Sequence, residues 1–397
     1  MVKLAENKKF IKGMFAVLFL LACFQNISLV SVGTIALKPV HVFSLFFLPV
    51  LMEKRAVSIN KKLWLYTVYV IVISLLNWKT FGIGGLLLNY VFGLYLITVC
   101  MNCGEMLSET DWSEILCLAA GILMAAVVIK NICGYKDFIW YFENPDKEHP
   151  WGLKTIIGGG LNIESSWLGL LAFFFYKSKW KWLYVSLNLL LSFLYGSRSG
   201  MLIAGAVIVW MLLPEVRKLK ERKYRIKTVI VLVIIGAVLY GTGLYDAVIG
   251  RAVNRFFEGL MDRGSVARLR MWKYVLQTGM SYPFGCGAGN CMQALTIVSG
   301  ETYVDGNLHN VYFQNLIEQG WLGGAVYLWM VLRFFWREGK RIISNPFVAS
   351  LFCYCVISLL QFRGADTIAC LILGAELVCS QEIWKSDCKI AKNILKR

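Results

Sequence analysis

Residues 308–324 read LHNVYFQNLIEQGWLGG, and in them a lone polar pair, His309-Asn310, opens a long apolar run. A histidine at such a boundary can meet water on one side and a lipid-borne substrate on the other. The pair also closes the polar stretch 244–310, which carries six basic residues in a chain otherwise built from hydrophobic blocks. We therefore expect any chemistry to be located here.

The composition indicates an integral membrane protein. The chain has 397 residues, of which 58% are hydrophobic and 16% charged, whereas soluble proteins average about 25% charged residues. A bilayer core of roughly 30 Å takes about 20 apolar residues to cross. We predict an all-α polytopic fold with about twelve transmembrane helices, of which the third, eighth and ninth are short, at residues 11–30, 33–51, 63–76, 81–100, 115–130, 156–176, 180–195, 199–213, 228–243, 311–332, 346–362 and 366–383.

The basic residues predict how the chain is oriented. If the N-terminus is cytoplasmic, 27 of the 41 Lys and Arg residues lie on the inside, as the positive-inside rule requires. The sequence thus predicts one membrane domain over residues 1–397 in the cytoplasmic (inner) membrane. Both termini would be cytoplasmic, and 244–310 would form a large extracytoplasmic loop containing short helices. This also accounts for the net charge of +17 without any nucleic-acid partner.

Cysteine and histidine usage predicts neither a disulfide framework nor a metal site. Most of the twelve cysteines lie inside apolar segments, where cysteine behaves as a small hydrophobe. Cys133, Cys286 and Cys291 fall in predicted outside loops, so an oxidising compartment could pair two of them or leave all three free. The three histidines lie in unrelated segments, which does not suit zinc.

Within the large loop, residues 265–279 read as a helix with Arg268 and Trp272 on its apolar face and Arg270 on its polar face. An unpartnered charge on an apolar face is costly, so Arg268 is the unusual cation. The following stretch, 282–290, reads YPFGCGAGN. Its glycines favour a tight turn, with a phosphate-binding loop as the alternative.

Two more charged residues lie at predicted outer helix ends. Arg198 occupies a very short connection, YGSRSG at 195–200, where it is either an interfacial anchor or a ligand-binding group. Glu164 lies in GGGLNIESS at 158–166, a polar entrance to an apolar run whose serines are also explained by helix-start chemistry.

Taken together, these motifs resemble the O-antigen ligase and polymerase family, membrane enzymes that join polyprenyl-linked saccharides outside the cytoplasmic membrane. The resemblance covers roughly residues 155–335. It rests on the order and spacing of SRSG at 197–200, RLRMW at 268–272, PFGCGAGN at 283–290, and HN at 309–310 followed by LIEQG at 316–320 and Gly323.

The resemblance implies a polyprenyl-diphosphate-linked oligosaccharide as donor and a saccharide hydroxyl as acceptor. Arg198 and Arg268 would bind the diphosphate, for which a guanidinium offers bidentate hydrogen bonds. His309 would be the general base, a role suited to a near-neutral pKa. Arg270, Asn310 and Glu164 are auxiliary candidates. Neither a cofactor nor a metal is then required.

The sequence leaves the class of acceptor open. We favour a polymerase of capsular, exopolysaccharide or O-antigen repeat units over a ligase that transfers the chain to a lipid core or protein. A lipid-linked oligosaccharide flippase or other transporter is the competing class, and a non-catalytic assembly component is a further alternative. The expected partners are the two substrates and the lipid bilayer, with a chain-length regulator or a flippase as further candidates.

Overall fold

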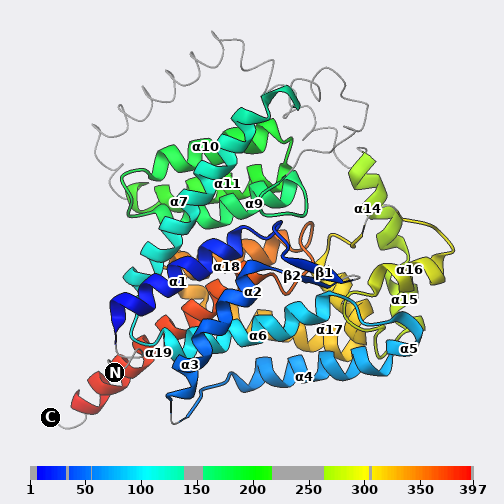
Figure 1. The fold of residues 1–397 in the computed structure, drawn as a ribbon, viewed down its shortest axis with the longest axis horizontal. Coiled ribbons are helices and arrows are strands. Elements are labelled where there is room, and N and C mark those ends of the chain that lie inside the picture. Colours follow the sequence, from blue (N-terminus) through cyan, green and yellow to red (C-terminus); the bar gives the residue numbers. More distant parts are fainter. Residues whose placement is uncertain are drawn as a thin grey trace. The chain divides into compact units, whose positions relative to one another are not determined.

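The computed structural model is mostly helical and divides into two compact units, Met1–Leu123 with Met271–Arg397 and Met124–Arg270 (Figure 1). It describes residues 7–32, 35–54, 56–137, 155–216, 263–303 and 306–394. Within these ranges the strands are limited to one short antiparallel hairpin, β1 (Val30–Val32) with β2 (Ile35–Leu37). The all-α prediction is therefore confirmed in its coarse form, whereas the single membrane domain stays a prediction.

The first unit holds most of the helices. They are α1 (Lys8–Cys23), α2 (Pro39–Ser44), η2 (Leu45–Phe47), α3 (Leu48–Met52), α4 (Lys61–Leu76), α5 (Trp78–Phe81), α6 (Leu86–Cys103), most of α7 (Glu109–Cys133), the end of α14 (Arg263–Lys273), α15 (Val275–Ser281), α16 (Cys291–Ser299), α17 (Val311–Glu338), η7 (Gly339–Arg341), α18 (Pro346–Ile357) and α19 (Thr367–Ile394). The second unit holds the end of α7, then α9 (Leu161–Ala172), η3 (Phe173–Phe175), α10 (Lys181–Leu194), α11 (Arg198–Val216) and the start of α14.

Two helices among the described residues are long and apolar enough to cross a membrane, α6 and α7. Shorter apolar helices, among them α9 with η3, α10, α11 and α18, coincide with other predicted spans. The count of twelve is thus not confirmed. The predicted span 228–243 lies outside the described residues, and the described part of the large loop contains short helices, as expected.

The predicted span 33–51 is wrong as a single helix. The structure places there β2, α2, η2 and α3, and a proline lies in the first turn of both α2 and α3, at Pro39 and Pro49. Proline has no amide hydrogen and cannot continue a helical hydrogen-bond ladder, but it fits a first turn. The two prolines therefore start new short helices inside an otherwise apolar run.

The predicted span 311–332 is also wrong as a single helix, because α17 reverses direction at Gly320 (φ 70°, ψ −177°). The rings of Tyr312 and Tyr327 are only 5.9 Å apart between centroids, and a Cβ on Gly324 would lie 3.2 Å from the Cα of Leu316. Residues fifteen apart in a straight helix are separated by about 22 Å. The two halves of α17 consequently pack against each other as a helical hairpin.

The core of the first unit is built by α6, which packs along α19 and against α4, and α4 in turn contacts α17 (Figure 1). Close approach of α6 and α19 depends on small residues. A Cβ on Gly93 would lie 2.7 Å from the Sγ of Cys370, and one on Gly374 would lie 2.7 Å from the Cβ of Cys100. These contacts fix α6 against α19, and α4 joins this pair to the hairpin of α17.

Candidate functional site

The glycine-rich loop 283–289 supports the break in α17. The backbone N–H groups of Cys286 and Gly287 donate to the carbonyls of Ile317 and Glu318 at 3.1 and 2.9 Å, and Trp321 N–H donates to the carbonyl of Pro283 at 3.1 Å. Carbonyls at a helix end need partners when water is excluded. The loop is thus a tight turn that caps a half-helix, and the two amides face protein carbonyls, which argues against the phosphate-binding alternative.

Helix α4 and the turn that follows it hold this loop in place. Ser74 Oγ accepts a hydrogen bond from the Ala288 N–H at 3.0 Å, and Asn77 Nδ2 donates to the Gly285 carbonyl at 3.2 Å. Gly84 lies against Gly289, since a Cβ on Gly84 would be 2.9 Å from the Cα of Gly289. The half-helix that begins beside His309 therefore rests on a rigid backbone support.

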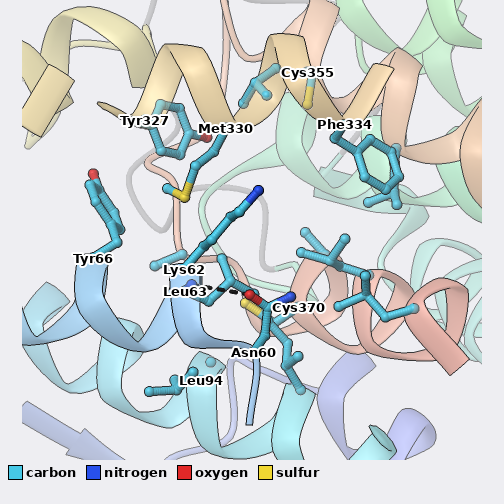
Figure 2. Close-up of a pocket in the computed structure, with 18 of the residues that line it drawn as sticks. Asn60, Lys62, Leu63, Tyr66, Leu94, Tyr327, Met330, Phe334, Cys355 and Cys370 are labelled. Carbon is cyan, nitrogen blue, oxygen red and sulfur yellow. Dashed lines mark hydrogen bonds between the residues drawn. The ribbon is translucent and has the colours of Figure 1, made fainter. Parts of the chain in front are cut away.

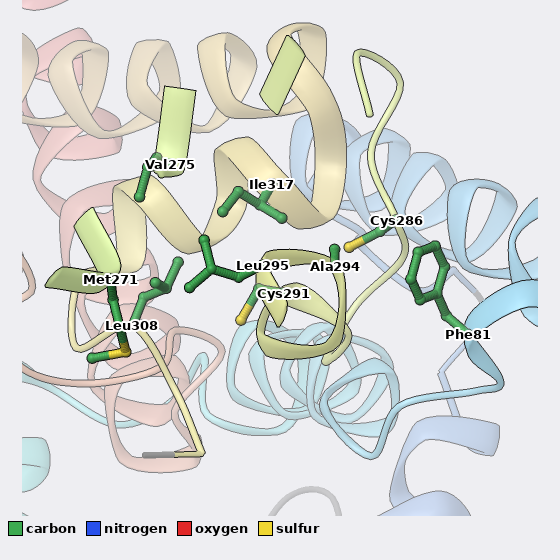
Figure 3. Close-up of a cluster of buried hydrophobic side chains, with 9 residues drawn as sticks. All are labelled: Phe81, Met271, Val275, Cys286, Cys291, Ala294, Leu295, Leu308 and Ile317. Atoms are coloured by element: carbon green, nitrogen blue, oxygen red, sulfur yellow. The ribbon is translucent and has the colours of Figure 1, made fainter. Parts of the chain in front are cut away.

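Leu308 anchors the histidine to the protein core. Its side chain is fully buried in the apolar cluster of α15, α16 and α17 shown in Figure 3. Its carbonyl accepts a hydrogen bond from the indole Nε1 of Trp272 at 2.9 Å. A residue fixed at both its side chain and its backbone leaves little freedom to the next one, which is His309.

His309 has a left-handed backbone, with φ at 53°. Its N–H donates to Asn307 Oδ1 at 2.7 Å, and Asn310 caps α17 by accepting from the Phe313 N–H at 3.0 Å. A left-handed conformation at a non-glycine residue costs on the order of 1–3 kcal/mol and is found disproportionately at functional sites. The half-buried imidazole is therefore held in a defined position, while Asn310 is occupied as a helix cap.

Arg363 is a cation near this loop that the sequence reading missed. It lies in the connection between α18 and α19, and one of its guanidinium nitrogens is 3.5 Å from where a Cβ on Gly306 would be. The same connection is joined to α17, because the Val311 N–H donates to the Ser358 carbonyl at 2.9 Å. An arginine between two predicted spans, on the side predicted for His309, was the signal that could have found it.

In the second unit, the SRSG motif directs its serines inward and its arginine to α14. Ser197 Oγ bonds Ser165 Oγ at 2.6 Å and Ser199 Oγ bonds Ser166 Oγ at 2.9 Å. Gly200 permits this contact, since a Cβ there would lie 2.6 Å from Ser165 Oγ. The start of α11 is thereby fixed against α9 by a buried network of hydroxyl groups.

Arg198, in the same motif, reaches the first turns of α14. Its Nη1 donates to Ser265 Oγ at 3.3 Å, and Ser265 precedes Arg268 by three residues on this helix, which is nearly one turn. Arg268 is half-buried and Arg270 exposed, in agreement with the faces predicted for them. The second unit thus ties the two arginine-bearing elements together, whereas convergence of both arginines with His309 of the first unit stays a prediction.

Glu164 is fully buried and its oxygens are used by protein groups. Oε1 accepts from Lys130 Nζ at 2.6 Å and from Tyr195 Oη at 2.9 Å, and Oε2 accepts from the N–H groups of Ile156 and Ile157. Such a set of partners joins α7, α9 and α10 to the segment before α9. It favours a structural role over the auxiliary role considered from the sequence.

The cysteines considered for a disulfide are free in the structure. Cys133 is exposed, whereas Cys286, within the glycine loop, and Cys291, two residues after it, are buried. Burial raises the pKa of the Cys286 thiol well above its usual range, which keeps it protonated and unreactive. The sequence left a disulfide and free thiols as alternatives for these cysteines, and the structure has free thiols.

The described residues form a mostly helical protein, in which Arg198 begins α11 and His309 lies just before α17. Residues 183–328 match the family model described as O-antigen ligase. This match supports an O-antigen ligase/polymerase-family protein and confirms the family resemblance predicted from the sequence motifs. The family is one of membrane glycosyltransferase-type enzymes of the cell envelope, with lipid-linked saccharide substrates. A search of curated proteins found no match to the chain.

Proposed function

We propose that this protein polymerises polysaccharide repeat units outside the cytoplasmic membrane. The observation that carries the proposal is the contact between Arg198 and Ser265, because it brings the Arg198 guanidinium to the helix that carries Arg268. Helix α14 also continues to Trp272, one turn beyond Arg268, and this residue bonds the carbonyl just before His309. The first contact supports a shared role for Arg198 and Arg268, and the second supports a fixed position for His309. That the three act at one site is part of the proposal.

In the proposed reaction an acceptor sugar hydroxyl attacks the anomeric carbon of the donor saccharide. The bond from this carbon to the diphosphate oxygen breaks, and polyprenyl diphosphate leaves with the electron pair. Arg198 and Arg268 bind the diphosphate and stabilise its growing charge. His309 takes the proton of the acceptor hydroxyl. The two guanidinium groups would supply the positive charge that a metal supplies elsewhere.

The test is a transfer assay with the purified chain and a synthetic polyprenyl-diphosphate repeat unit. The proposal expects longer glycans and released polyprenyl diphosphate. Removing one charge-stabilising group typically lowers kcat by about 10²–10³, so His309→Ala, Arg198→Ala and Arg268→Ala should each lose at least that much. Lys273→Gln changes an exposed charge on the same helix and should keep the activity. If the three variants remain folded and extend glycans normally, the proposal is wrong.

Ser265 is proposed to position Arg198 rather than to touch the substrate. The Arg198 guanidinium is charged, and a hydrogen bond to a charged group contributes about 1.5–3 kcal/mol, so Ser265→Ala should raise KM for the donor about tenfold or more with a smaller change in kcat. Ser265→Thr, which keeps the hydroxyl, should restore KM. An equal loss in both variants would indicate a structural role only.

Ligase activity is the second candidate, because both activities share the motifs and differ in the acceptor. Offering a lipid-core acceptor beside the repeat unit distinguishes the two. Transfer to the core without glycan extension would replace the polymerase assignment, and movement of the lipid-linked unit across vesicles without any transfer would favour a flippase.

A further inference from the structure

Two apolar cavities lie next to each other between α4 and the second half of α17. The larger has a volume of about 470 Å³ and extends to α6, α18 and α19. The smaller has a volume of about 270 Å³ and is bounded by α4 and α17 alone. Ligand pockets in proteins are commonly about 300–1,000 Å³. Together the two cavities offer room for more than one apolar chain.

The two cavities share one wall, and that wall carries a cation. Lys62, Tyr66, Trp329 and Met330 line both of them. Figure 2 shows Lys62 extending from α4 toward Met330 of α17. The ammonium group lies 5.0 Å from the centre of the Trp329 ring, a cation–π contact that holds it at the junction.

A second cation stands beside the first. Arg333 lines the larger cavity, and its guanidinium carbon lies 5.6 Å from the centre of the same Trp329 ring. Lys62 and Arg333 are both exposed, and within the described part of the chain neither forms an ion pair. Arg337, which also lines this cavity, differs, because it pairs with Glu338 at 2.7 Å. Two positive charges are therefore available to a ligand here.

The acid of the larger cavity lies away from these cations. Asp366 is the one acidic group among the described residues that line it, and its carboxylate accepts a hydrogen bond from Tyr354 Oη at 2.6 Å. Asp366 just precedes α19, whose Cys370 meets Gly93 in the middle of α6. Lys62, in contrast, is in the first turn of α4. Ser58, three residues before this helix, forms hydrogen bonds with Asn102 at the C-terminal end of α6. One end of the cavity is thus cationic.

We propose that this surface binds an anionic phospholipid, with one acyl chain in each cavity and the phosphate against Lys62 and Arg333. Two apolar lobes that meet at one cation match a lipid with two chains and one headgroup, whereas a polyprenyl lipid has a single chain. Bilayer lipid is itself apolar, so filling the lobes gains little by the hydrophobic effect. Selectivity must therefore come from the charges, each worth a modest attraction to an anionic headgroup.

Lys62 lies in segment 52–62, which is predicted to be cytoplasmic, and Arg333 lies against the same Trp329 ring. With that topology the lipid comes from the cytoplasmic leaflet. Neither cavity is lined by Arg198, Arg268 or His309, so this proposal does not depend on the proposed transfer reaction.

The experiment measures lipid retained by the purified full-length protein after reconstitution into nanodiscs of equal phosphatidylglycerol and phosphatidylcholine, followed by delipidation and native mass spectrometry. Wild type should retain phosphatidylglycerol preferentially. Lys62→Gln and Arg333→Gln should each weaken this preference about fivefold, from the attraction of one charge near the surface. Lys61→Gln is the matched control, because Lys61 is exposed and adjacent but lines neither cavity.

A second variant tests the chain site rather than the charges. Leu94→Trp narrows the larger cavity, which Leu94 lines (Figure 2), and should lower retention of both phospholipids. Leu118→Trp changes an exposed residue of α7 that lines neither cavity and should not. Wild type in high salt gives a result even if a variant fails to fold, because screening should reduce the preference for the anionic lipid.

Several outcomes would overturn the proposal. They are equal retention of both phospholipids, a preference that survives both Gln substitutions and high salt, or retention unaffected by Leu94→Trp. Displacement of the phospholipid by an added polyprenyl phosphate, with sensitivity to Lys62→Gln, would assign the cavities to the single-chain lipid instead.

Discussion

Gly285 and Gly320 meet backbone to backbone. A Cβ on Gly285 would lie 2.7 Å from the amide nitrogen of Gly320, and a Cβ on Gly320 would lie 2.7 Å from the amide nitrogen of Gly285. Each glycine also has a positive φ, 94° and 70°. The turn of the 283–289 loop and the reversal of α17 are therefore one structural unit, and neither position accepts a side chain.

Gly320→Ala should strongly destabilise the protein. At φ 70° and ψ −177° Gly320 lies in a region that is essentially restricted to glycine, which costs alanine about 1–3 kcal/mol, and forcing a methyl group against packed backbone adds about 1–3 kcal/mol. Gly300→Ala is the comparison, since Gly300 has the milder left-handed conformation (φ 69°, ψ 6°) and nothing within 4 Å of its added Cβ. Thermal unfolding in detergent should show a much larger drop in Tm for Gly320→Ala. Equal drops would mean that the two backbones are not in contact.

The break at Gly320 explains why helix prediction worked unevenly. The expected span 115–130 falls within α7. The expected span 311–332 has the same appearance in sequence, but its geometry depends on Pro283 and Gly285, more than thirty residues earlier. The span holds three glycines, Gly320, Gly323 and Gly324, and glycine inside a helical pattern is tolerated in many helices, so the local pattern could not reveal that the chain reverses at Gly320.

Candidate site residues could be proposed from the sequence where chemistry and spacing coincided. His309, Arg198 and Arg268 were proposed because charged residues at apolar boundaries are costly and therefore conspicuous, and their roles stay predictions. Glu164 was equally conspicuous, but its partner Lys130 lies 34 residues away on α7, and no sequence pattern pairs them. Arg363 was missed because a lone arginine in a short connection resembles an ordinary interfacial anchor.

Cys286 should remain a reduced thiol that does not react with alkylating reagents at neutral pH. Burial raises its pKa above the usual value of 9.0. Above about pH 9 the unfolded state would lose this proton before the folded state does, so the contribution to stability is present below that pH and declines as pH rises. Mass spectrometry after alkylation should find Cys133, which is exposed, modified and Cys286 unmodified. A disulfide at Cys286, or rapid alkylation, would contradict the buried thiol.

Glu164→Gln should lower stability without removing activity. Glu164 is fully buried and its ion pair with Lys130 joins α7 to α9, so weakening this interaction should cost about 2–3 kcal/mol. Glu114→Gln is the control, because Glu114 forms an exposed pair with Lys12 and exposed pairs contribute about 1 kcal/mol or less. Below its own Tm, Glu164→Gln should retain its kcat. Unchanged Tm with a lost kcat would instead place Glu164 in the reaction.

The left-handed backbone of His309 predicts an unusual order of stability among its variants. At φ 53° alanine is strained by about 1–2 kcal/mol, while the extra freedom of glycine in the unfolded chain costs about 0.4–1 kcal/mol. His309→Gly should therefore be somewhat more stable than His309→Ala, although both lack the imidazole and should be inactive in glycan transfer.

Thr302 provides the comparison, because it is exposed and has no positive φ. There the order should reverse, with Thr302→Gly less stable than Thr302→Ala in thermal unfolding. The same order at both positions would show that His309 relaxes to an ordinary backbone. A His309→Gly variant that is more stable than His309→Ala, yet inactive in glycan transfer, would show that the protein accepts backbone strain at this residue. The strain would then hold the imidazole where the transfer reaction requires it.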